Sequence, residues 1–248
     1  IWVVAQDGSG PPEQLTRESK ERKTGLEWSP DSKRIAFTDK SGRLNVLDVT
    51  SKAVTEVTRD KGGNVGDHQW SPDSAWMAFS LGDENGLRSL WIWGGSDGGL
   101  RRVTDEMWNE SEPVWDPSGD YLWFLCDREF APQLMGLEWN FAVNRSTGVY
   151  ALALKKDGAH PFPPESDEVT VAEDPSKAKP AEGDKKDETK SGDQGDKEGD
   201  KEKDKDAKKA PKPVVIDFEG LAQRVVRLPV DPDNYDSLTA NEGHLFFM

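Results

Sequence analysis

The chain has 248 residues, of which 34% are hydrophobic and 32% charged, and its 47 acidic and 32 basic residues give a net charge of −15. This excess of negative charge repels a phosphate backbone, so nucleic acid is not an expected partner. No run of 18 apolar residues occurs, so we predict no membrane-spanning helix and no membrane partner. The single cysteine, Cys126, excludes a disulfide within the chain and is predicted to be a buried small hydrophobe.

Short β-strands separated by turn residues are predicted from the first residues onward. Residues 1–16 supply two strands and end in a Leu-Thr pair. Strands rich in β-branched or aromatic residues follow at residues 25–28, 34–39, 43–48 and 54–58. The same series returns at residues 67–70, 76–81, 89–93 and 100–103. The chain is therefore predicted to be all-β, with four strands in each repeating unit.

A five-residue motif, Trp-Ser-Pro-Asp-Ser, follows the first strand of the unit. It occupies Trp28 to Ser32 and Trp70 to Ser74, and it returns in altered form as Trp115 to Gly119, at spacings of 42 and 45 residues. A second marker, a Leu-Thr or Val-Thr pair, keeps nearly the same period. Repetition at this period is typical of the four-stranded blades of a β-propeller, because each blade must stack on its neighbours to bury its faces.

The motif predicts a tight corner between the first two strands of a blade. Proline fixes φ near the value that a type I turn needs, and the aspartate after it can bond its own backbone. The predicted corner residues are Pro30, Asp31, Pro72, Asp73 and Pro117. The tryptophans before the corners are predicted to pack between blades rather than to bind a ligand, since aromatic residues repeated at one blade position are most often core. These are Trp28, Trp70 and Trp115.

The strand count predicts an incomplete propeller with about four blades' worth of four-stranded antiparallel units. Residues 1–164 hold a half blade at 1–16 and blades that begin near residues 25, 67 and 112. Residues 165–213 contain 12 lysines, 16 acidic residues and no aromatic residue, so they are predicted to be a disordered insertion. Residues 214–248 are predicted to continue the propeller, with the outer strand of the third blade and the start of the next. The chain begins without Met and ends in an apolar, strand-like run, so we expect an excerpt from a larger propeller.

No catalytic residue, cofactor site or metal site is predicted. Residues 94–98 match the G-x-S-x-G elbow of serine hydrolases, but no helix pattern follows Ser96, so a hairpin turn is expected. The histidines His68, His160 and His244 lie at unrelated blade positions, and none has a second ligand at metal-binding spacing.

The residues after the insertion resemble a known family. The Trp-Ser-Pro-Asp-Ser corners are similar to those of TolB-like and peptidase propellers in general. Residues 214–230, read as Val-Val-Ile-Asp-Phe-Glu-Gly-Leu-Ala-Gln-Arg-Val-Val-Arg-Leu-Pro-Val, are followed by Asn234 and Tyr235. This stretch looks like the blade-closing segment of tricorn protease and its bacterial homologues, in which a Lys- and Glu-rich insertion also stands just upstream. The resemblance covers nearly the whole chain, with the insertion as the variable part.

The resemblance implies a function without implying a catalytic residue. In that family the propellers are non-catalytic and sit beside a PDZ-like domain and a serine protease core, so the parent protein is expected to be a serine peptidase. The propeller that resembles this chain is thought to guide unfolded peptides to the active site. Expected partners are therefore an unfolded polypeptide substrate, the protease domain of the same parent chain and further copies of the parent.

Two other classes of function stay open from the sequence. A TolB-like propeller would bind a partner protein, and a prolyl-oligopeptidase-type propeller would precede an α/β-hydrolase domain. The sequence that follows Met248 discriminates among the three classes. A cytoplasmic location is expected, with the periplasm as the alternative, because the true N-terminus is expected to be missing from this sequence and the absence of a signal there says nothing about export.

Overall fold

The computed structural model describes residues 1–17, 21–62, 65–129, 133–134, 141–142, 145–163 and 211–248. Within these ranges the regular structure is almost entirely β, with four-stranded antiparallel sheets, shorter two-stranded pairs and one 3-10 helix. The predicted disordered insertion, 165–213, lies outside the described residues except for 211–213. No helix among the described residues is long and apolar enough to cross a membrane.

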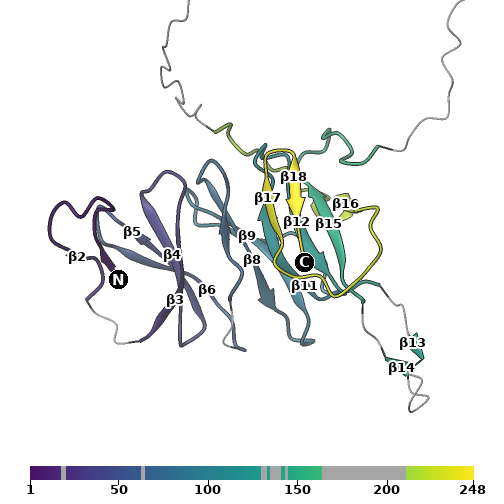
Figure 1. Cartoon of the computed structure of the whole chain (residues 1–248), viewed down its shortest axis with the longest axis horizontal. Helices are drawn as coiled ribbons and strands as arrows, with labels where there is room; N and C mark the ends of the chain where they lie inside the picture. The colour runs from purple at the N-terminus through teal and green to yellow at the C-terminus, as the bar shows by residue number, and fades with distance from the viewer. Residues whose placement is uncertain (18–20, 63–64, 130–132, 135–140, 143–144, 164–210) are drawn as a thin grey trace, which may run out of the picture. The chain divides into compact units, whose positions relative to one another are not determined.

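The first and second blades are each built from four consecutive strands (Figure 1). The first blade consists of β3 (Lys23–Trp28), β4 (Arg34–Asp39), β5 (Arg43–Asp48) and β6 (Val54–Arg59). The second consists of β7 (Gln69–Trp70), β8 (Trp76–Gly82), β9 (Arg88–Gly94) and β10 (Leu100–Arg102). Each strand pairs only with the strand before and after it in the chain, which is the antiparallel meander of a propeller blade.

The third blade draws its last strand from beyond the insertion. Its strands are β11 (Glu110–Trp115), β12 (Tyr121–Cys126), β15 (Gly148–Ala153) and β16 (Val225–Arg227). Strand β16 pairs with β15 in a register that sets Val226 opposite Ala151. A short helix, η2 (Leu221–Arg224), precedes β16 and is not foreseen by the strand pattern. It follows Gly220, whose φ of 67° turns the chain at that point.

Two-stranded pairs complete the described sheets. They are β1 (Trp2–Val3) with β2 (Glu13–Gln14), β13 (Gln133–Leu134) with β14 (Phe141–Ala142), and β17 (Thr239–Asn241) with β18 (His244–Phe246). The pair β13-β14 belongs to the connection between β12 and β15, while the other two pairs flank the three full blades in the sequence. The prediction of an all-β propeller made of four-stranded antiparallel units is confirmed.

The hydrophobic core lies between neighbouring blades. One cluster joins Ala36 and Val46 of the first blade to Met77 and Phe79 of the second. Another joins the second blade to the third, and a third joins the third blade to the pair β17-β18. Because β4, β8 and β12 have a neighbouring strand on either side and apolar layers on both faces, the residues in the middle of each strand are buried. Stacking of blades, rather than one central core, therefore stabilises the fold.

Candidate functional site

The three Trp-x-Pro corners adopt one backbone conformation. The Ser32 amide donates to the Ser29 carbonyl at 2.8 Å, and the other two corners repeat this bond at 2.9 and 2.8 Å. Ser32, Ser74 and Gly119 close the turns with φ of 59°, 63° and 75°. A Cβ on Gly119 would stand 2.8 Å from Cγ2 of Val214, so the third corner requires glycine where the first two keep serine.

The aspartates of the first two corners bind their own turn and also the next blade. The Asp31 carboxylate accepts from the Ser29 hydroxyl at 2.6 Å and from the amide two residues further on at 3.1 Å. Its own amide donates to Oγ of Ser74, in the second blade, at 3.0 Å. Asp73 binds its turn in the same way and accepts from the Val214 amide at 2.6 Å. The corners are thus points where consecutive blades are joined.

The three corner tryptophans do not share one environment. Trp70 and Trp115 are 3% and 4% exposed, so they pack between blades as expected. The Trp70 ring meets Trp93 edge-on at 6.2 Å between centroids, and the Arg34 guanidinium lies 4.6 Å from its centre. Trp28 is 45% exposed in this chain, so its packing between blades stays a prediction. On its side of the first blade the described residues supply only the two-stranded pair β1-β2, which leaves the inner strand β3 uncovered.

The innermost strands of neighbouring blades are joined by side chains. Strands β3, β7 and β11 belong to separate sheets, so backbone N–H groups on their free edges have no ladder partner. Glu27 Oε1 accepts from the Trp70 amide at 3.4 Å, and Gln69 Oε1 accepts from the Trp115 amide at 2.7 Å. The Trp115 indole also donates to the Gln69 carbonyl, at 3.1 Å. We call these contacts the Glu27 seam and the Gln69 seam.

A second row of hydrogen bonds runs beside the seams. The register of β3 and of β11 shifts at a bulge, with φ of 60° at Gly25 and 51° at Glu112. The Gly25 carbonyl accepts from Nε2 of His68 at 2.7 Å. Asp67 accepts from the Glu112 amide at 3.0 Å, and Glu112 in turn accepts from the Leu238 amide at 2.7 Å. Each blade therefore offers an acceptor to the next, and neither the bulges nor this row is visible in the strand pattern.

The seams and corners enclose a shallow groove of about 300 Å³. Three tryptophans and three prolines from the three corners make most of its lining, and Glu27 is its single ionisable group. The lining residues are Glu27, Trp28, Pro30, Gln69, Trp70, Pro72, Trp115 and Pro117. The structure thus brings together at one surface the repeated residues that the sequence places 42 and 45 residues apart.

Two titratable groups at the junction of the first two blades are perturbed by burial. Burial raises the pKa of Glu27 to about 7, and the hydrogen bond from the Trp70 amide offsets this only in part. Burial lowers the pKa of His68, against the opposing effects of the Gly25 carbonyl and the Asp67 charge. Glu27 Oε2 and His68 Nδ1 are buried without a hydrogen-bond partner. Both groups therefore favour the neutral form more than they would in water.

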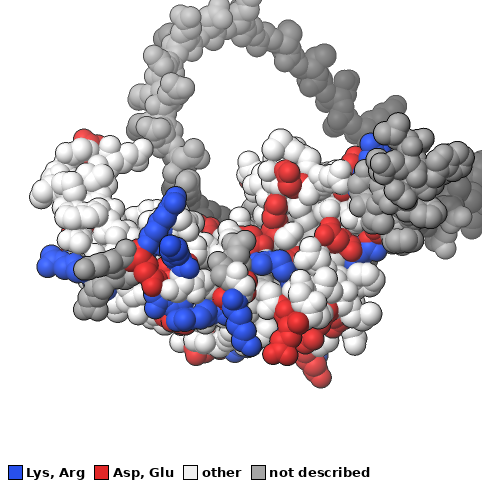
Figure 2. Space-filling view, turned by 90° about the horizontal axis from the view of Figure 1, so that it is seen from below, with Lys and Arg blue, Asp and Glu red and all other residues white. Residues whose placement is uncertain are grey.

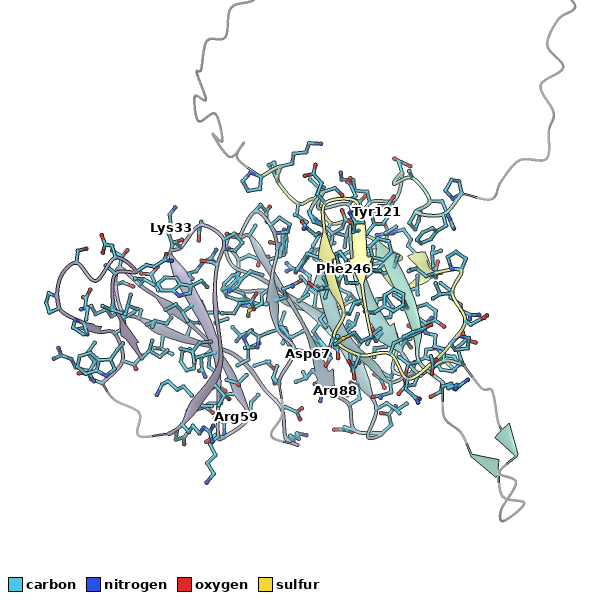
Figure 3. The ribbon with its side chains drawn as sticks, viewed as in Figure 1. Lys33, Arg59, Asp67, Arg88, Tyr121 and Phe246 are labelled. Atoms are coloured by element: carbon cyan, nitrogen blue, oxygen red, sulfur yellow. The ribbon has the colours of Figure 1, made fainter. Side chains whose placement is uncertain are left out.

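The end of the blades away from the corners carries basic side chains. Lys33 lies at the corner end, whereas Arg59 and Arg88 lie at the opposite end (Figure 3). Seen from that end, Lys and Arg gather over the first two blades (Figure 2). Arg88 stands 3.6 Å from the Asp60 carboxylate, and Arg59 stands 3.5 Å from Glu56. Each of these two arginines therefore lies beside a carboxylate that offsets its charge.

The serine and the histidines that were considered for catalysis or metal binding in the sequence do not form a common site. Ser96 is exposed in the turn between β9 and β10, where the Gly98 amide donates to the Gly94 carbonyl at 2.9 Å, so the hairpin is confirmed. His160 and His244 are exposed on other segments. Among the described residues no group of three or more His, Cys, Asp or Glu is placed to hold a metal ion.

The cysteine is buried as expected. Cys126 is 1% exposed, and burial raises the pKa of its thiol to about 12. The Arg128 guanidinium donates to its sulfur at 3.1 Å and to the fully buried Glu110 at 2.7 Å. A thiol with this pKa is protonated at neutral pH and does not act as a nucleophile.

Blades that repeat one corner motif and are joined along their inner strands define a domain of the β-propeller class. A family model described as the tricorn protease second beta propeller domain matches residues 1–248. The chain therefore belongs to this family.

Individual relatives agree with the family model. Over 223 residues the chain is 27% identical to tricorn protease homolog 1 from Streptomyces coelicolor, covering 90% of this chain and 18% of the relative. It is 21% identical to a putative tricorn-like protease C-terminal subunit from Sulfurisphaera tokodaii, covering 90% of this chain and 21% of the relative. A crystal structure of the tricorn protease matches with a TM-score of 0.68 at 14% identity, over 94% of this chain and 20% of that one, which supports the fold alone. The chain spans about a fifth of the length of these proteins.

Proposed function

We propose that this chain is a non-catalytic propeller of a tricorn-like serine peptidase and that it guides unfolded peptides toward a protease domain elsewhere in the same protein. The groove formed by the three Trp-x-Pro corners carries this proposal. Aromatic rings and prolines present rigid apolar surface at little entropic cost, and such surface suits extended chains of many sequences. A groove of this size accepts a few side chains at a time, so it favours a threaded peptide over a folded domain.

Capture at the second and third blades occurs through side chains rather than through strand addition. Adding a peptide strand to a sheet edge requires free backbone donors on that edge. The amides of Trp70 and Trp115 are already bound by the side chains of Glu27 and Gln69. We therefore assign the contacts with a peptide to the tryptophan and proline side chains of the three corners, Trp28 among them.

The proposal assigns no chemistry to the chain itself. Nucleophilic catalysis needs a nucleophile, a base and an orienting group within hydrogen-bond reach. Ser96 lies in an exposed hairpin, and His160 and His244 belong to other exposed segments. Peptide hydrolysis, the protease domain, assembly with further copies and a cytoplasmic location are accordingly proposed for the parent protein.

Replacing Trp28 with alanine in the full-length protein tests the guiding role. We expect kcat/KM for an unfolded protein substrate to fall by roughly five- to tenfold, which corresponds to about 1 kcal/mol of lost contact. Cleavage of a fluorogenic tripeptide should stay unchanged, because so short a substrate does not need the rim. The matched control is Trp2→Ala, since Trp2 is 63% exposed and lies on β1, outside the groove lining.

Four results would contradict the proposal. An unchanged rate on the unfolded substrate would remove the rim from the substrate path. An equal loss on both substrates would indicate damage to the protease domain instead. A loss of the same size in Trp2→Ala would show that any exposed tryptophan has this effect. A full-length protein that cleaves neither substrate would leave a binding propeller as the function.

A further inference from the structure

We propose that the Glu27 seam is a pH-responsive joint, in which a protonated carboxyl binds the second blade and an ionised carboxyl releases it. The Gln69 seam stands at the same position one blade later and has no such response, because an amide does not titrate. This inference goes beyond the guiding of peptides, since it concerns how firmly the first two blades are joined beside the groove.

The two seams differ in their hydrogen bonds although their residues are equivalent. The Trp115 amide lies 2.7 Å from Gln69 Oε1, whereas the Trp70 amide lies 3.4 Å from Glu27 Oε1. The Trp115 indole donates to the Gln69 carbonyl at 3.1 Å, but the indole nitrogen of Trp70 is buried without a partner. The Glu27 seam therefore rests on one long bond and the Gln69 seam on two shorter ones.

The surroundings of Glu27 suit a neutral carboxyl. One oxygen faces the Trp70 amide, and the other, Oε2, is buried with no donor beside it. A neutral carboxyl has the shape of the amide in Gln69, and leaving its O–H without a partner costs less than leaving a charge without one. An ionised carboxylate would keep a negative charge on an oxygen that neither water nor protein solvates, which costs several-fold more than burying a neutral group.

The charged and titratable groups around the seam do not supply the missing counter-charge. His68 precedes β7, Arg34 extends from β4 over the Trp70 ring, and Asp31 lies in the first corner. Burial and the Trp70 amide are the only causes of the Glu27 pKa shift, so none of these groups acts on it appreciably. Of the three, His68 could titrate in the same pH range, and its own pKa is lowered.

Ionisation near neutral pH should therefore move the carboxylate toward water. The Trp70 amide then loses its acceptor, and the first corner is free to shift relative to the second. Because Trp28, Pro30, Trp70 and Pro72 from these two corners line the groove, its width would change with pH. Peptide entry into the groove would be easiest at a pH at which Glu27 is ionised.

Hydrogen exchange of the full-length protein between pH 5.5 and 8.5 tests the joint. The readout is the protection of the Trp70 amide relative to that of the Trp115 amide, each corrected for its intrinsic exchange rate. In the native protein we expect this ratio to fall about tenfold for the first pH unit above the transition. In Glu27→Gln the ratio should stay constant across the range.

Substitutions that swap the side chains of the two seams provide the matched controls. Gln69→Glu should give the Trp115 amide a pH-dependent protection that it lacks in the native protein. His68→Gln, which keeps a donor toward the Gly25 carbonyl, should leave the Trp70 response intact. A ratio that does not depend on pH in the native protein would overturn the proposal. A response that survives in Glu27→Gln, or that vanishes in His68→Gln, would assign the switch to another group and overturn it as well.

Discussion

Truncating Trp70 should destabilise the propeller far more than truncating Trp28, although the two residues occupy the same place in the repeat. A tryptophan buries roughly 200 Å², which at about 25 cal/mol per Å² corresponds to about 5 kcal/mol. Trp70 is 3% exposed and also loses its contacts with Trp93 and Arg34, so Trp70→Ala should cost about 3 to 5 kcal/mol. Trp28 is 45% exposed, so just over half of this area is buried, and Trp28→Ala should cost about 3 kcal/mol at most.

Urea unfolding measures the difference between these variants. Because a protease domain is proposed for the full-length protein, the transition of the propeller is best followed by hydrogen exchange of β8 and β9, which lie in the middle of the second blade. The free energy of unfolding should drop clearly in Trp70→Ala and slightly in Trp28→Ala. A loss below about 1 kcal/mol in Trp70→Ala, or equal losses in both variants, would refute packing between blades as the role of this position.

Four further outcomes follow from individual contacts. Cys126 should resist thiol reagents at pH 8 in the native protein and react only on unfolding, which a time course with and without denaturant measures. Gly119→Ala should cost about 1 to 2 kcal/mol in urea unfolding, because it adds a Cβ at positive φ against Val214, whereas Ser32→Gly should cost nothing. Glu110→Ala should cost about 3 to 5 kcal/mol in the same assay, since it leaves a partly buried guanidinium unpaired. Deleting residues 165–210 should leave the unfolding transition unchanged, and a large loss would show that this segment is an integral element.

Strand positions could be predicted from the sequence because each strand has a local signature. Strands β4 and β5 have the bounds that their β-branched and aromatic runs predict, since both edges are marked by turn residues. The corners could be predicted equally well, because proline and aspartate act through the backbone of their own turn. The family resemblance of residues 214–230 is confirmed by the match of the whole chain.

Contacts between blades could not be predicted, because they depend on which residues meet across sheets. The burial of Trp70 and the exposure of Trp28 come from identical motifs, so only the neighbouring strands distinguish them. Glu27 and Gln69 likewise look like ordinary polar residues on a strand until each is found facing an amide of the next blade. The bulge at Glu112 gave no signal either, since a positive φ is unusual for glutamate.

The seams show how one repeat position can take two functions. Innermost strands leave amides unpaired, so each blade must offer an acceptor, and either glutamine or a neutral glutamate satisfies that need. Glutamate differs from glutamine only when its carboxyl ionises and carries a charge. Burial raises the pKa of Glu27 to about 7 even though the hydrogen bond from the Trp70 amide opposes this shift. The single bond from Trp70 therefore offsets only part of the cost of burying the charged carboxylate.

The direction of the pH effect follows from the same values. The folded protein binds the Glu27 proton more tightly than the unfolded chain does, so this stabilisation is complete below about pH 4.5 and is lost as the pH rises to about 7. His68 acts in the opposite sense, because burial lowers its pKa and its contribution is lost as the pH falls below 6.5. The two residues both join the first blade to the second, so their titrations act in opposite directions on the stability of this junction. The bond at the Trp70 amide depends on Glu27, so a site-resolved measurement separates the effect of Glu27 from that of His68.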